Sequence, residues 1–107
     1  MHWFYLLLAG LLEIVWAIGL KYTEGFTRPF ASAVTFTAMV FSVLLLGLAL
    51  KQIPVGTGYA IWTGIGAAGT AILGMWLFQE PATAPRFFCI GLIIAGILGL
   101  KLLSNSA

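Results

Sequence analysis

The chain has 107 residues, of which 62% are hydrophobic and 7% are charged, and it carries five Lys or Arg against three Asp or Glu. Because a soluble domain carries about 25% charged residues, this composition indicates a polytopic membrane protein, and five scattered cations exclude the clustered basic face of a nucleic-acid-binding protein. The single cysteine, Cys89, excludes an intramolecular disulfide and a cysteine-cluster metal site.

The first apolar segment, residues 3–20, is long enough to cross a bilayer as a helix of roughly 20 residues, and it has one carboxylate, Glu13, near its middle. A charged side chain at that depth costs about 2.5–3.5 kcal/mol, usually faces a bundle interior or a water-filled cavity, and usually marks an ion or substrate pathway. Gly10 and Ala17 share the helical face of Glu13, and Trp16 follows it by three residues. We therefore interpret Glu13 as a functional group; the alternative is a carboxylate that snorkels or stays protonated in a packed bundle.

Three further apolar segments, residues 30–50, 55–78 and 87–103, are separated by short breaks that contain all four prolines. Because open sheets and exposed irregular backbone cannot span lipid, the sequence predicts four transmembrane helices, with consecutive helices as neighbours that alternate in direction. In the second segment, Ser42 is the polar residue nearest the centre. We leave open whether it only bonds to its own backbone, as a lone membrane serine usually does.

The third segment is rich in aromatic residues and glycines. Tyr59, Trp62 and Gly66 fall on one helical face together with Gly69. Gly64, Gly66 and Gly69 also spell the dinucleotide-binding pattern G-x-G-x-x-G, which we reject because that pattern requires a preceding strand. Glycines in a membrane helix permit close helix contact or a bend, so Gly64 and Gly66 are predicted to serve packing or to act as a hinge.

The fourth segment presents three small residues, Gly91, Ala95 and Gly99, at spacings of four. Such a stripe lets membrane helices pack closely, and we interpret it as a dimer-forming surface. Four short helices can hardly enclose a path across the membrane, and no internal repeat supplies the inverted symmetry that many transporters use. A second copy inserted in the opposite direction would supply it.

The charges at the two ends of the helices are nearly balanced, because Lys51 and Lys101 stand against Lys21, Arg28 and Arg86. A bias of Lys and Arg normally fixes orientation, so this balance permits both orientations. The expected fold is therefore an all-α membrane protein with four transmembrane helices that forms an antiparallel, dual-topology homodimer.

No enzymatic constellation is visible in the sequence. It contains no Asp, its only histidine is His2 at the terminus, and no metal-ligand spacing occurs. The Ser and Thr residues lack a base partner. We therefore expect no catalytic residue, no metal and no cofactor.

Three motifs resemble the small multidrug resistance family: Glu13 in mid-membrane, the loop 24–28 and the run 54–66. With the chain length included, the resemblance covers essentially all of residues 1–107, which would form a single transmembrane domain. Within the family, residues 10–17 and 19–22 resemble the guanidinium-exporter subtype. The drug-exporting subtype typically has small or hydroxyl residues where Trp16 and Ala17 stand.

The resemblance implies an antiparallel homodimer in the bacterial inner membrane that exports guanidinium and small substituted guanidines in exchange for protons. Glu13 would be the shared site for the proton and the cation. Trp16 and Ser42 would hold Glu13 by hydrogen bonds, and Tyr59 and Trp62 would line its pocket. The implied partners are thus the cation, protons, membrane lipid and a second copy.

The chemistry of these residue types agrees with that expectation. Guanidinium is planar and offers a fork of N–H donors that suits a carboxylate, and aromatic rings attract cations by about 0.5–2 kcal/mol each. One departure is Gly58, where the family more often has Ala; it adjoins Tyr59 and bears on the substrate range.

Two alternatives stay open. The first is a broader quaternary-ammonium or multidrug exporter of the same family, against which Trp16 and Ser42 argue because a quaternary ammonium cannot donate hydrogen bonds. The second belongs to another class, a structural membrane subunit or assembly factor in which Glu13 carries no substrate.

Overall fold

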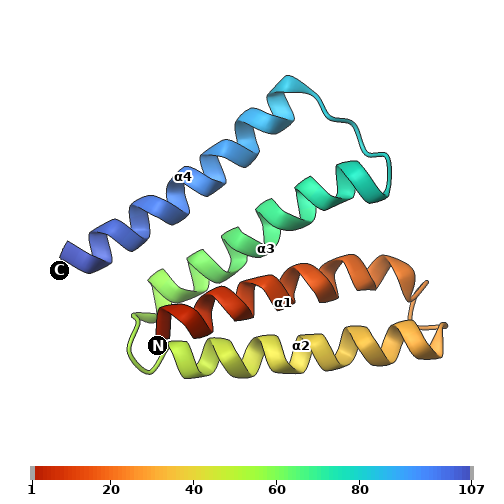
Figure 1. Ribbon diagram of the computed structural model, residues 1–107, viewed down its shortest axis with the longest axis horizontal. Coiled ribbons are helices and arrows are strands. Elements are labelled where there is room, and N and C mark those ends of the chain that lie inside the picture. Colours follow the sequence, from red (N-terminus) through yellow and green to blue (C-terminus); the bar gives the residue numbers. More distant parts are fainter. Residues whose placement is uncertain (1, 107) are drawn as a thin grey trace.

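The computed structural model describes residues 2–106, which form four α-helices joined by short connections (Figure 1). The helices are α1 (His2–Tyr22), α2 (Pro29–Ala49), α3 (Val55–Leu77) and α4 (Ala84–Ser106). Each of them contains a segment that is long and apolar enough to cross a membrane. The predicted all-helical fold with four candidate membrane spans is therefore confirmed.

Prolines mark where three of these helices begin. Pro29 is the first residue of α2, and Pro54 directly precedes α3. Pro85 is the second residue of α4, so this helix begins at Ala84 and not at Phe87, where the sequence pattern placed its start. A proline fits the first turn because the N–H that it lacks would have no partner within the helix there.

The central helix is α1, which lies between α2 and α3 and packs against both (Figure 1). Among the described helices, the backbone of α4 approaches α3 alone. Small residues let α1 and α2 come close, because Ala9 and Ala49 are fully buried between them. The core lies where α1, α2 and α3 meet, and it consists of Leu6, Ala9, Leu46, Ala49, Ile53, Ile61 and Trp62.

The least covered helix is α4. Only 6% of its membrane span is buried within the chain, against 22–28% of the other three spans. A Cβ atom added at Gly91 or Gly99 would meet no atom within 4 Å, and Ala95 between them is exposed. The small-residue stripe on α4 is therefore uncovered in the single chain.

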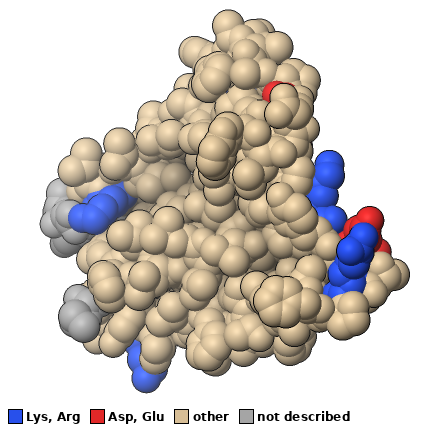
Figure 2. All heavy atoms as spheres, turned by 45° about the vertical axis from the view of Figure 1, so that its right-hand side comes forward, with Lys and Arg blue, Asp and Glu red and all other residues tan. Residues whose placement is uncertain are grey.

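Charged side chains lie mostly toward the edges of the face shown in Figure 2, and uncharged atoms cover its broad middle. In the turn between α1 and α2, Glu24 pairs with Arg28, and both side chains are exposed. Helices that cross a membrane are expected to place their charges in this way, at the two interfaces.

Candidate functional site

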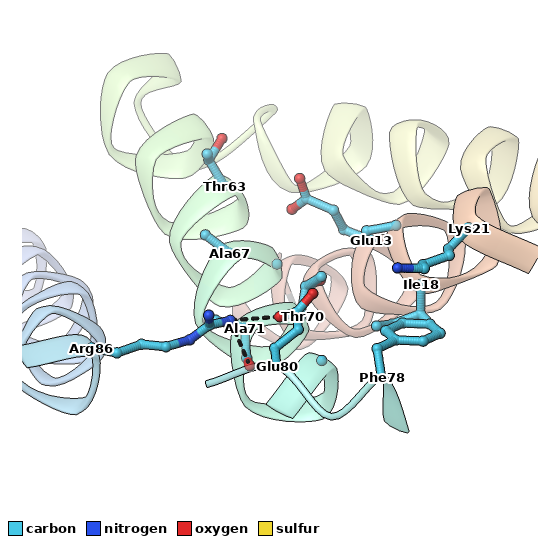
Figure 3. A pocket seen from close by; sticks show the side chains of 13 residues that line it. Glu13, Ile18, Lys21, Thr63, Ala67, Thr70, Ala71, Phe78, Glu80 and Arg86 are labelled. Atoms are coloured by element: carbon cyan, nitrogen blue, oxygen red, sulfur yellow. Dashed lines mark hydrogen bonds and ion pairs between the residues drawn. The ribbon is translucent and has the colours of Figure 1, made fainter. Parts of the chain in front are cut away.

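A cleft of about 470 Å³ lies beside α1 and α3, with Glu13 on its wall (Figure 3). At its other end lie Glu80, from the connection after α3, and Arg86, from the first turns of α4. The cleft therefore joins a carboxylate within the membrane span of α1 to a polar opening near the end of α3. Its α3 wall is built of small and hydroxyl-bearing residues: Thr63, Gly66, Ala67, Thr70, Ala71 and Gly74.

The close approach of α1 to α3 depends on glycines of α3. Gly66 is buried, and a Cβ atom there would collide with the carboxylate of Glu13. One turn further along α3, a Cβ atom at Gly69 would collide with Ile14 in the same way. Gly66 thus leaves the space that the Glu13 carboxylate occupies between the two helices.

Two buried polar atoms on α1 have no hydrogen-bond partner among the described residues: Glu13 Oε1 and Trp16 Nε1. Most buried polar atoms in proteins are paired, so each exception calls for an explanation. An unpaired carboxylate oxygen on the wall of a cleft is a group to which a proton or a cationic ligand can bind.

Ser42 is fully buried and connects three helices. Its hydroxyl donates to the backbone carbonyl of Ala9 on α1 at 2.6 Å and accepts from the indole N–H of Trp62 on α3 at 3.0 Å. The single hydroxyl hydrogen is used on Ala9, so it serves neither the backbone of α2 nor Glu13. We expected the Ser42 hydroxyl to bond to Glu13. In the single chain it bonds instead to the carbonyl of Ala9, a fully buried residue about one helical turn before Glu13.

The aromatic pair of α3 lies outside the wall of the cleft. Trp62 is buried, whereas Tyr59 is 55% exposed, and the two ring centroids are 5.6 Å apart. We expected both rings to line the pocket of Glu13. Within the single chain the cleft brings Glu13 together with Gly66, and Tyr59 and Trp62 are not among the residues that line it.

The family model of the Small Multidrug Resistance protein matches residues 1–93. The chain belongs to the small multidrug resistance family. It is therefore a membrane transport protein and not an enzyme.

Individual relatives are similar over almost their whole length. The chain is 61% identical to a guanidinium exporter of Salmonella typhimurium strain LT2 over 102 residues, which are 95% of this chain and 97% of the relative. It is 58% identical to a guanidinium exporter of Yersinia pseudotuberculosis serotype I over 104 residues, or 97% of this chain and 100% of the relative. A guanidinium exporter of Citrobacter freundii is 58% identical over 102 residues.

In this family member, two other predicted glycines serve the packing of helices. A Cβ atom at Gly10 would lie 2.7 Å from Ile65 Cγ2, so Gly10 lets α1 approach α3. A Cβ atom at Gly64 would lie 2.8 Å from Ile97 Cγ1, so Gly64 lets α4 approach α3. Both glycines stand beside the cleft residues along the helices but do not line the cleft.

The sequence analysis missed the polar outer end of the cleft. Lys21, Glu80 and Arg86, which are charged residues near the ends of helices, all line it. Arg86 Nη2 lies 2.6 Å from Glu80 Oε1, and Lys21 Nζ lies 4.8 Å from the centroid of the Phe78 ring (Figure 3). Residues of α1, α4 and the α3–α4 connection meet here, which spacing along the chain does not reveal.

The hydroxyl groups of the α3 wall were also missed. Thr63 and Thr70 line the cleft, and Thr70 Oγ1 is buried without a hydrogen-bond partner in the described part of the chain. The sequence does carry a signal for this wall. From Thr63 to Gly74, small and hydroxyl-bearing residues recur every three or four positions, which places them on one face of the helix.

Proposed function

We propose that this transporter exports guanidinium and small substituted guanidines in exchange for protons, and that Glu13 binds both. The observation that carries the proposal is the position of Glu13. It is the one carboxylate within the four candidate membrane spans, and it lies on a cleft with Oε1 unpaired among the described residues. The substrate is supported by relatives, 58–61% identical, that are named guanidinium exporters.

The chemistry of the two ligands makes them exclude each other. A carboxylate holds guanidinium through charge-assisted N–H···O hydrogen bonds, which are often bidentate and stronger than neutral ones. Protonation removes the negative charge that these bonds require. If Glu13 takes either a proton or the cation, but never both, it carries one ligand in each direction, and lower pH weakens the apparent affinity for guanidinium.

We further propose that two copies in opposite orientations form the transporter in the bacterial inner membrane. The nearly even division of Lys and Arg between the two ends permits both orientations. The uncovered α4, with Gly91, Ala95 and Gly99, is a suitable surface for contact between copies. The exposed ring of Tyr59 would then face the second copy and line the Glu13 pocket from there; the family resemblance implies the lining of the pocket, and the exposure of the ring supports its contact with the second copy.

The experiment uses purified protein in liposomes that contain a pH-sensitive dye. An imposed guanidinium gradient should move protons in the opposite direction in wild type and not in Glu13→Gln, which keeps the size of the side chain but loses its charge. Glu24→Gln is the matched control, because Glu24 is exposed and does not line the cleft.

Two results would contradict the proposal. No proton movement in wild type would favour a structural subunit or assembly factor. Equal proton movement with tetramethylammonium would instead favour the broader drug exporter.

A further inference from the structure

The cleft contains a second carboxylate, Glu80, and its partner in the chain is itself a guanidinium group. Arg86 Nη2 lies 2.6 Å from Glu80 Oε1 and donates to the backbone carbonyl of Ala71 at 3.5 Å (Figure 3). Both acceptors belong to residues that line the cleft on which Glu13 lies. The side chain of Arg86 therefore demonstrates how this end of the cleft holds a guanidinium group.

Glycines of α3 seat both carboxylates in the same manner. A Cβ atom at Gly66 would collide with the carboxylate of Glu13, and a Cβ atom at Gly74 would lie 2.5 Å from Glu80 Oε1. Gly66 and Gly74 are eight residues apart in the sequence. At 1.5 Å per residue this is about 12 Å along the helix axis, so the two carboxylates lie near the two ends of one wall.

The wall between the carboxylates offers a hydrogen-bond acceptor. Ala67, Thr70 and Ala71 lie along it, and their side chains are small. Thr70 Oγ1 is buried and has no hydrogen-bond partner among the groups that the structure describes. Its lone pairs can accept an N–H group from a cation that moves past it.

Two cationic side chains of the protein border the outer end of the cleft, the end away from Glu13. Lys21 makes a cation–π contact with Phe78, with Nζ 4.8 Å from the centroid of the ring, and Arg86 forms an ion pair with Glu80. Their charges oppose the approach of a third cation. The carboxylate of Glu80 is the group at this end that can offset that repulsion.

We infer that Glu80 is an outer binding site for the transported cation, where guanidinium takes the place of the Arg86 side chain before it passes along Thr70 to Glu13. The inference rests on the proposed guanidinium transport and names a second residue that positions the substrate. The exchange costs little interaction energy, because one guanidinium–carboxylate contact replaces another. The ion pair is also open to it, since the side chains of Arg86 and Glu80 are 30% and 38% exposed and such pairs are weak.

The test measures initial rates of guanidinium-driven proton movement in proteoliposomes across a range of guanidinium concentrations. Glu80→Gln should raise KM about two- to fivefold, as expected for a partly exposed carboxylate, with little change in the maximal rate. Arg86→Gln should lower KM, because it removes the competing guanidinium group. Glu24→Gln and Arg28→Gln should leave KM unchanged, since their ion pair is of the same kind but lies outside the cleft.

A double variant separates binding at Glu80 from a general electrostatic field. Glu80→Gln combined with Arg86→Gln has the same net charge as wild type, so a field effect predicts the wild-type KM. A binding carboxylate predicts the raised KM of Glu80→Gln. The wild-type value in the double variant would overturn the inference.

Other outcomes are equally decisive. A raised KM in both single variants would mean that the ion pair only fastens the α3–α4 connection, and an unchanged KM in Glu80→Gln would exclude binding there. If Glu80→Gln does not fold, a raised KM in Arg86→Gln suffices to refute the inference. Wild type that does not exchange guanidinium would refute the proposed function together with it, whereas the results above, obtained with active wild type, refute Glu80 alone.

Discussion

The carboxylate of Glu13 lies against Gly66, so closely that one methyl group on Gly66 would collide with it. The contact joins α1 to α3 at the depth where the proposed site must bind its ligands. The absence of a side chain at Gly66 thus governs where the carboxylate can lie, and a substitution at Gly66 tests this.

Gly66→Ala should reduce guanidinium exchange by on the order of tenfold to a hundredfold, the range expected when a positioned group is displaced by about 1 Å. The carboxylate is the end of a flexible side chain and can shift. Since alanine also favours the helix by up to about 1 kcal/mol, the unfolding free energy should change little. Exchange in proteoliposomes and unfolding in detergent measure the two effects.

Gly69→Ala is the matched control for that variant. Its added methyl group would collide with Ile14, an apolar and flexible side chain, and not with a carboxylate. Exchange should stay near the wild-type rate. Full exchange by Gly66→Ala, or an equal loss in both variants, would show that the position of the Glu13 carboxylate is not what Gly66 controls.

Ser42→Ala should destabilise the bundle by about 1–3 kcal/mol, because it leaves the buried indole N–H of Trp62 without its acceptor. The measurement is the unfolding free energy in detergent micelles, followed by circular dichroism. In a cycle with Trp62→Phe, the double variant should lose less than the sum of the single variants, since the orphaned donor is gone. Strict additivity would contradict the role assigned to this hydrogen bond.

The chain offers a matched control for Ser42 on the same helix. Thr35 is also buried, but its Oγ1 has no partner among the described residues. Thr35→Val keeps the shape and removes an unpaired hydroxyl, so it should be neutral or stabilising. A loss equal to that of Ser42→Ala would mean that packing, not hydrogen bonding, decides both results.

The transporter should select cations that carry N–H donors. At equal concentration, guanidinium should be exchanged for protons at least about a hundredfold faster than tetramethylammonium, which leaves buried acceptors unpaired. Trp16→Phe should reduce this preference, because we propose that the indole N–H of Trp16, unpaired among the described residues and three residues from Glu13 on α1, donates to the Glu13 carboxylate and orients it when the cation binds. Comparable exchange of both cations by wild type would be the contrary result.

Orientation in the membrane should respond to a small change in charge. Reporters fused to the C-terminus of wild type should reveal both orientations in one cell, because the Lys and Arg residues of the two ends are nearly balanced. Thr27→Lys with Ala82→Lys adds two exposed cations at the end that already has three, and should turn that end to the cytoplasm. Thr27→Gln with Ala82→Gln is the uncharged control, and a single orientation in wild type would contradict the balance argument.

Much of the architecture could be predicted from the sequence because it depends on consecutive residues. The length and apolarity of a segment decide whether it can cross a membrane, so four spans could be read before any contact was known. The significance of Glu13 also follows from its place within a single segment, since a lone carboxylate at that depth is costly wherever the other helices lie. Proline was less informative about the exact start of α4, because the first turn of a helix accepts it.

The contacts of the site depend instead on how the helices cross, and no local pattern specifies that. Ser42 could have bonded to its own helix or to Glu13, and the packing of α2 on α1 gave it Ala9 and Trp62. Glu80 and Arg86 are near the ends of α3 and α4 in the sequence, and only the path of the α3–α4 connection places them on the cleft with Glu13. The spacing of the glycines predicts that another helix can come close to α3. It does not predict which side chain fills the space at each glycine, because a space left by a missing Cβ can accept any neighbouring atom. The tertiary structure decides this: α1 brings Glu13 and Ile14 to Gly66 and Gly69, and the α3–α4 connection brings Glu80 to Gly74.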